Sequence, residues 1–68
     1  MKLALSKMTR PELEKILENA NFTQDEENVF WLLARGKTIT EISQLENVSE
    51  RTVNRKITGI RLKVSRLE

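Results

Sequence analysis

The sequence predicts an all-α fold, and three features lead to that prediction. Apolar residues recur at intervals of three and four, which is the spacing of one face of a helix. Threonine or serine precedes each periodic stretch, where helices prefer an N-cap residue. Asparagine or glycine follows several of the stretches, where helices commonly end in left-handed backbone. A chain of 68 residues has room for one domain, which we expect to span residues 1–68.

Four helices are expected along the chain, at about residues 10–19, 24–35, 39–45 and 50–66. The last three helices are expected to form a three-helix core at 22–66. The first helix, at 9–20, is an additional N-terminal unit of the same domain. In a capping box, a threonine and a glutamate three residues later satisfy the free N–H groups of a helix start. The first two helices each begin with such a pair, namely Thr9 with Glu12 and Thr23 with Glu26.

The apolar residues predict how these helices pack. The second helix is apolar nearly all round from Val29 to Ala34, so we expect it to be central, with Trp31 facing the first helix. In the third helix the expected inward residues are Ile39, Ile42 and Leu45. In the fourth helix they are Val53, Ile57, Ile60, Val64 and Leu67. Gly59 lies in the middle of this last helix, where it marks a bend, marks a close backbone approach, or has no role.

The basic charge is concentrated near the C-terminus. Residues 49–68 contain six basic and two acidic residues, a net charge of +4. Residues 1–48 contain six basic and eight acidic residues, a net charge of −2. Such asymmetry is typical of a phosphate-binding element, although an ordinary solvated helix also explains it.

The composition argues against an enzyme. The chain has no cysteine and no histidine, so the commonest metal ligands and the commonest general base are absent. Its two glycines, Gly36 and Gly59, are too far apart for a phosphate-binding loop. We therefore expect no catalytic residue, metal site or cofactor. The apolar stretches are too short for a membrane span or a signal peptide, which predicts a cytoplasmic protein.

The third and fourth helices are joined by a three-residue turn, residues 46–48, that precedes the cap residue Ser49. This arrangement matches a helix-turn-helix, whose second helix enters the major groove of DNA. Residues 22–63 resemble the LuxR/GerE-type helix-turn-helix domain and are also similar to region four of bacterial sigma factors. The matching positions are Thr23, Glu26, Gly36, Glu41, Ile42, Val48, Ser49, Thr52, Val53 and Ile60. The sequence departs from the family at Ser43, where alanine is usual, and at Lys56, where histidine is frequent. It also departs at Glu46, where an apolar residue is usual, so a shifted or reshaped turn is expected.

The resemblance implies that Asn54, Arg55 and Thr58 face base edges. The helical spacing independently places Arg55 and Thr58 on the outer face, with Asn54 beside them. Arg51 shares that outer face and joins the expected base readers, although its place near the helix start also suits a phosphate. The remaining expected phosphate contacts are Lys37, Thr38, Thr40, Ser49, Thr52, Lys56, Arg61 and Lys63. For Lys56, Arg61 and Lys63 the alternative is exposed charge that only aids solubility.

These features predict a sequence-specific regulator of transcription that binds double-stranded DNA. The alternative is a protein-interaction module that docks on RNA polymerase or another regulator, using an apolar patch of Leu3, Leu5 and Leu62. Oligomeric state stays open. Val64 and Leu67 extend the apolar stripe, which either pairs with a second copy or folds back against the first helix.

Overall fold

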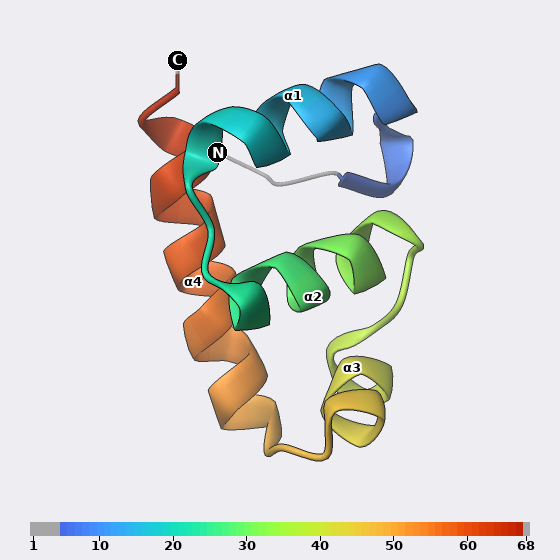
Figure 1. Cartoon of the computed structure of the whole chain (residues 1–68). Coiled ribbons are helices and arrows are strands. Elements are labelled where there is room, and N and C mark those ends of the chain that lie inside the picture. Colours follow the sequence, from blue (N-terminus) through green and yellow to red (C-terminus); the bar gives the residue numbers. More distant parts are fainter. Residues whose placement is uncertain (1–4, 68) are drawn as a thin grey trace.

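The computed structural model describes residues 5–67, and the regular structure in that range is entirely helical (Figure 1). The elements are the 3-10 turn η1 (Leu5–Lys7) and the helices α1 (Arg10–Ala20), α2 (Gln24–Ala34), α3 (Ile39–Glu46) and α4 (Glu50–Ser65). The predicted all-α class with four helices is confirmed, and each helix end lies within one residue of its expected place. The turn η1 is an additional element that the sequence pattern does not predict.

The longest helix, α4, organises the fold. It contacts α1, α2 and α3, while η1 packs on α2. In Figure 1, α1 and α2 run in opposite directions on one side of α4, and α3 lies near the beginning of α4. Among the helices of residues 5–67, none covers one long side of α4.

The core forms where α2, α3 and α4 meet. Its fully buried side chains are Phe30, Ile42, Ile60, Val29 and Val53. The ring of Trp31 meets that of Phe30 edge to face, with the ring centroids 5.5 Å apart. The Arg10 guanidinium of α1 lies 5.7 Å from the centre of the Trp31 ring, within the range of a cation–π contact. Trp31 thus faces α1, as the sequence predicts.

The helix ends follow the local sequence. Both predicted capping boxes form, and Thr38 with Glu41 makes a third at the start of α3. Asn21 and Asn47 end α1 and α3 with φ values of 57° and 55°, a left-handed conformation that asparagine tolerates. Gly36 follows α2 with φ of 83°, where a side chain would be strained.

The prediction that Leu45 faces the core is wrong, because its side chain is 60% exposed. Ile42 and Ser43 are the buried residues of α3, and they centre its inward face about 110° away from Leu45. Glu46, by contrast, lies on the inward side of α3 and is half-buried. Val48, just after the turn, supplies the next apolar contact with the core.

Two further expectations concerned the chain ends. Leu5 is 2% exposed, so its placement in an exposed apolar patch is wrong; η1 turns it into the core. Leu3 lies outside the described residues. Val64 is buried, and Leu67, 40% exposed, lines a shallow hollow with Lys15, Ile16 and Asn19 of α1. The end of the apolar stripe therefore packs back toward α1.

No helix within residues 5–67 has the length and apolar character needed to cross a membrane. The same residues contain no group of three or more acidic, histidine or cysteine side chains placed to hold a metal ion.

Candidate nucleic-acid interface

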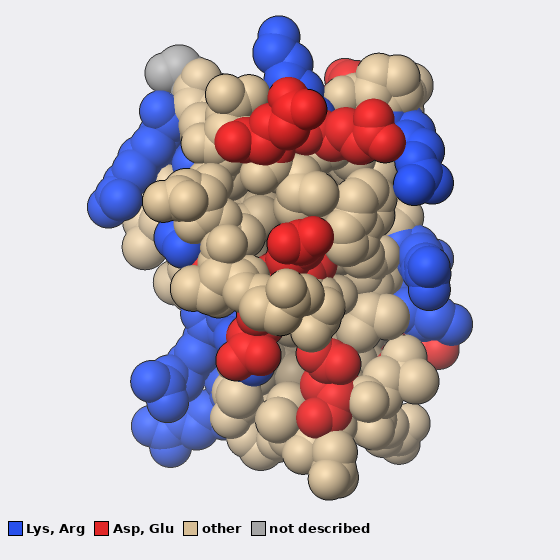
Figure 2. All heavy atoms as spheres, in the orientation of Figure 1, with Lys and Arg blue, Asp and Glu red and all other residues tan. Residues whose placement is uncertain are grey.

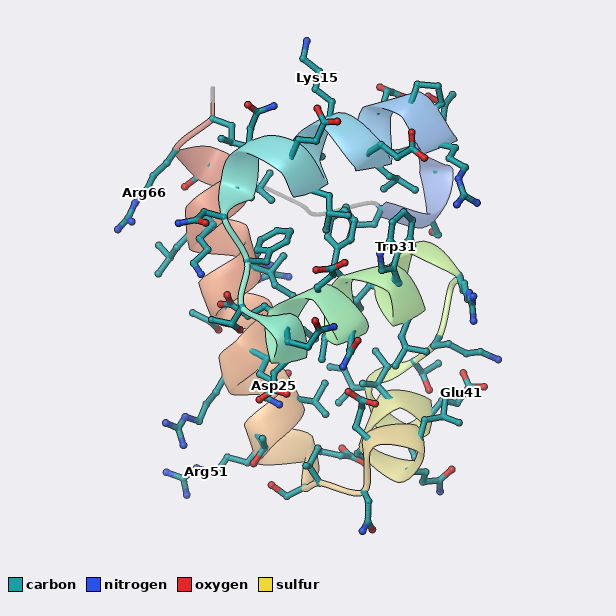
Figure 3. The ribbon with its side chains drawn as sticks, viewed as in Figure 1. Lys15, Asp25, Trp31, Glu41, Arg51 and Arg66 are labelled. Carbon is teal, nitrogen blue, oxygen red and sulfur yellow. The ribbon has the colours of Figure 1, made fainter. Side chains whose placement is uncertain are left out.

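The outer side of α4 exposes all four expected base readers. Arg51, Asn54, Arg55 and Thr58 are each exposed, and their spacing puts them on one face over two helical turns. Leu62, 55% exposed, continues that face toward the C-terminus. Figure 3 shows the labelled Arg51 and Arg66 extending away from the rest of the molecule.

Thr58 has an internal hydrogen bond that limits what it offers to a ligand. Its hydroxyl donates to the backbone oxygen of Asn54 at 3.0 Å. The hydroxyl proton is therefore used within α4, as is common for threonine in a helix. What Thr58 presents outward is a methyl group and an oxygen lone pair.

The basic residues along α4 fall into two groups. Arg51, Arg55, Arg61 and Arg66 form no ion pair with any residue in the range 5–67. Both lysines are paired with acids at the start of α2, Lys56 with Asp25 at 3.5 Å and Lys63 with Glu26. Figure 2 shows acidic side chains across the middle of the drawn face and basic ones at its sides, including the side of α4.

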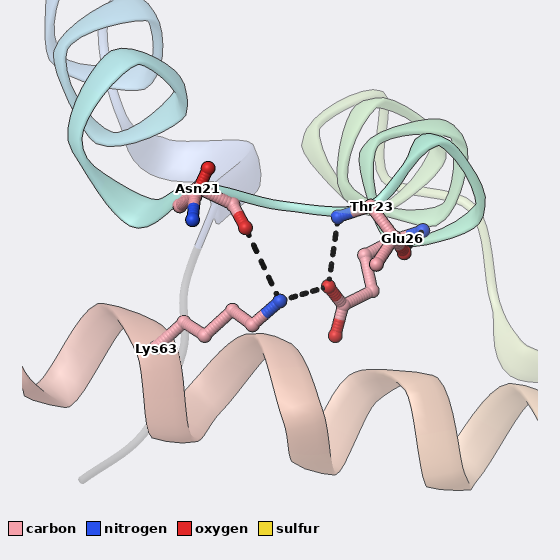
Figure 4. A network of polar contacts seen from close by, with 4 residues as sticks. All are labelled: Asn21, Thr23, Glu26 and Lys63. Atoms are coloured by element: carbon pink, nitrogen blue, oxygen red, sulfur yellow. Dashed lines mark hydrogen bonds and ion pairs between the residues drawn. The ribbon is translucent and has the colours of Figure 1, made fainter.

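Lys63 is the centre of a polar network between α4 and the start of α2 (Figure 4). Its Nζ donates to the Glu26 carboxylate and to the backbone oxygen of Asn21, the latter at 3.3 Å. The same carboxylate accepts the Thr23 backbone N–H at 3.0 Å. These bonds, that from Lys63 first, hold the pKa of Glu26 below its usual value. Glu26 is therefore a capping and ion-pairing residue that ties α2 to α4.

The same network explains Gly59. A Cβ added to this residue would lie 2.7 Å from Oε2 of Glu26. What lies closest to Gly59 is thus a side chain, the Glu26 carboxylate, rather than the backbone of another segment.

The two lysines consequently lie on the flank of α4 that faces α2. Lys56 and Lys63 are half-buried, whereas Arg61 is exposed on the opposite flank. There Arg61 borders a shallow hollow with Leu33, Ile39, Asn54, Ile57 and Thr58. Of the three residues expected to attract phosphate by charge alone, Arg61 is the one left without an acidic partner in the described part of the chain.

The hydroxyl groups at the start of α4 are used in capping. Ser49 accepts the Thr52 backbone N–H at 3.1 Å, and the two hydroxyl oxygens are 3.0 Å apart. Both side chains are at the surface or partly exposed, next to Arg51. The two expected phosphate contacts are thus close together at a helix N-terminus, a position that favours anions.

Carboxylate groups lie close to the start of α3. Lys37 lies 4.0 Å from the carboxylate of Glu41. The Thr38 N–H donates to that carboxylate, and this bond is the first cause that lowers the pKa of Glu41. The Thr40 hydroxyl donates to Oε2 of Glu50 at 3.0 Å. Each of the three expected phosphate contacts here, Lys37, Thr38 and Thr40, therefore has a carboxylate beside it.

The turn between α3 and α4 is short and fixed by its own hydrogen bonds. After the left-handed Asn47, the Val48 N–H donates to the backbone oxygen of Ser43 at 3.0 Å. Ser43 is 9% exposed, and its hydroxyl donates to the Thr40 backbone oxygen at 2.7 Å. The hydroxyl of Ser43 is thus hydrogen-bonded, and no buried side-chain polar atom of the described residues is left unsatisfied.

Comparison with known proteins adds no identification: no family model, no curated protein and no solved structure matches this chain.

Proposed function

We propose that this protein is a sequence-specific, double-stranded DNA-binding regulator of transcription that inserts α4 into the major groove. The observation that carries this proposal is the exposed face of α4, where Arg51, Asn54, Arg55 and Thr58 lie side by side. The two arginines have no ion-pair partner within residues 5–67, so their charge is available to a ligand.

The chemistry of this face suits base edges. Arginine pairs with guanine and asparagine with adenine through two hydrogen bonds each, and a methyl group contacts that of thymine. The resemblance to LuxR/GerE-type domains supports the same three positions, Asn54, Arg55 and Thr58. It also supports a bacterial or phage origin and a nucleoid-associated setting. A homodimer in which each copy reads one half-site is proposed on a separate ground, since helix-turn-helix regulators commonly pair two such units.

Selection from a pool of random duplexes, followed by fluorescence anisotropy on the selected duplex, tests the proposal. We expect a defined consensus, and affinity that falls steeply with added salt because phosphate contacts release counterions. Asn54→Ala and Arg55→Ala should flatten the base preference more than Arg61→Ala does, since Arg61 is assigned to the backbone. Failure to bind any duplex at low salt would end the proposal.

The runner-up function is docking on RNA polymerase or another regulator. It is favoured by Leu62, which is 55% exposed on the same face of α4. Leu62→Ala should weaken such docking because it removes the exposed apolar side chain, while duplex affinity should stay within about twofold because no charge on this face changes. Co-sedimentation with purified RNA polymerase provides the measurement.

A further inference from the structure

Glu50 is an acidic residue at the beginning of an otherwise basic surface. It is the first residue of α4, it is exposed, and it lies next to Arg51 and one turn before Asn54. Its Oε2 accepts the hydroxyl of Thr40, which belongs to α3, at 3.0 Å. The side chain is therefore held by the preceding helix.

We propose that Glu50 is a base-reading residue that selects cytosine, an inference that rests on the proposed DNA-binding function. The first residues of a recognition helix are the ones that reach base edges. A carboxylate only accepts hydrogen bonds, and in the major groove cytosine presents a donor while guanine and thymine present acceptors. Adenine places an acceptor beside its donor and so disfavours a second negative oxygen.

Thr40 acts in this scheme as a positioning residue. Its hydroxyl holds one carboxylate oxygen, and no other donor within residues 5–67 bonds to the Glu50 carboxylate. The second oxygen is then free for a base. Fixing a side chain in advance reduces the entropy lost on binding. The bond also uses the hydroxyl proton of Thr40 that a phosphate contact would need.

The negative charge of Glu50 should have opposite effects on two quantities, the affinity for random duplexes and the discrimination among duplexes. A carboxylate close to DNA repels phosphates at every sequence, whereas its bond to cytosine forms at only one. Glu50 should therefore lower affinity for random duplexes and raise discrimination among them. The arginines of α4 raise affinity for both kinds of duplex.

The alternative for Glu50 is purely structural. An acid in the first turn of a helix stabilises the helix through its dipole. That role predicts a change in thermal stability when Glu50 is replaced, but no change in base preference. Base preference is consequently the readout that separates the two roles.

The experiment compares the full-length wild type with Glu50→Gln, Thr40→Val and the control Glu18→Gln. The control removes the same charge from an exposed position on α1. Each variant is used in selection from a random duplex pool. Anisotropy then measures affinity for a random duplex and for four selected duplexes that differ only in the base pair assigned to Glu50. Thermal unfolding shows that each variant is folded.

For the wild type we expect a preference of about fivefold or more for cytosine at that one position. Glu50→Gln should lose it and shift toward adenine, because glutamine pairs with adenine. It should also bind the random duplex more tightly. Thr40→Val should weaken the cytosine preference, and Glu18→Gln should leave it unchanged.

Two results would count against the inference. If Glu50→Gln shows the wild-type base preference at every position, Glu50 does not read a base although the protein binds DNA. If the wild type binds no duplex at all, the proposed function itself fails and this inference fails with it.

Discussion

The basic residues of α4 form two regions with different surroundings. We call Arg51, Arg55, Arg61 and Arg66 the arginine face, and Lys56 and Lys63 the lysine flank. The arginine face is exposed and makes no ion pair within residues 5–67, whereas the lysine flank is half-buried against acids of α2. A count of charges treats all six alike. Their partners show that only one region is available to an anionic ligand.

The difference has a simple physical origin. Asp25 and Glu26 lie in the first turn of α2, where acidic residues are favoured by the helix dipole. Lys56 and Lys63 are seven residues apart, so they lie on the same side of α4, two turns from each other. The fold brings that side against the acidic turn. The lysines therefore join two helices, while the arginines point into solvent.

The largest expected effect separates these regions by DNA affinity. Arg55→Ala should weaken binding to the selected duplex by about 1–3 kcal/mol, the contribution of one paired base contact. Lys56→Ala, next to it in sequence, should change affinity by less than about twofold, because its charge is already opposed by Asp25. Anisotropy at several salt concentrations measures both. Equal losses in the two variants would remove the distinction between the regions.

The lysine flank should matter instead for stability. Glu26→Gln removes the charge that Lys63 contacts, and we expect a loss of about 1–3 kcal/mol in the free energy of unfolding at neutral pH. Since the pKa of Glu26 is lowered in the folded state, its contribution is fully present above the usual glutamate range and is lost as pH falls from that range through the lowered pKa of the folded protein. Urea unfolding between pH 7 and pH 3 should therefore show a weaker pH dependence in Glu26→Gln. The same dependence in both proteins would contradict this role.

The affinity of Glu26→Gln for the selected duplex complements the measurement of its stability. Glu26→Gln should bind DNA at least as tightly as the wild type wherever it is folded, because Lys63 is released from its partner. A strong loss of duplex affinity would mean that the pairing of the lysine flank with α2 is needed to position the arginine face for DNA.

The smallest effect concerns Gly59. Replacing glycine by alanine inside a helix normally gains about 1 kcal/mol. Here the new Cβ would displace the Glu26 carboxylate, so Gly59→Ala should be close to neutral in the wild type. In a Glu26→Ala background the full gain should appear. The free energies of unfolding of the wild type, the two single variants and the double variant form a double-mutant cycle. Additive changes in these free energies would show that Glu26 and Gly59 do not interact.

The helices themselves were readily predicted from the sequence. Capping threonines and a capping serine, left-handed asparagines and a glycine after α2 are local signals, and they account for every helix end except the C-terminal end of α4. The orientation of α3 was harder. Ile39, Ile42 and Leu45 fit one face by spacing, but the buried Ser43 and half-buried Glu46 rotate that face away from Leu45. Because a polar residue at an inward position adds nothing to the apolar pattern, that pattern does not locate the inward face of α3.

The candidate site was predicted in part. Exposure of Arg51, Asn54, Arg55 and Thr58 followed from helical period alone. The pairing of Lys63 with Glu26, 37 residues apart, and of Glu50 with Thr40 depends on how helices are placed in space. No local pattern carries that information. Two residues of the network stand out in the sequence, namely Glu26 at a capping position and Gly59 one turn before Lys63. The capping box alone accounts for Glu26, and the open roles of Gly59 name no partner, so neither residue predicts the pairing.

The most direct test of the central claim is a titration of ¹⁵N-labelled protein with the selected duplex, followed by amide chemical shifts. If the arginine face is the DNA contact, the largest shifts should occur in α4 between Arg51 and Leu62, with smaller ones at the start of α3. The indole N–H of Trp31, which packs toward α1, should remain nearly unchanged. Shifts centred on Trp31 and α1, with α4 unaffected, would contradict the account.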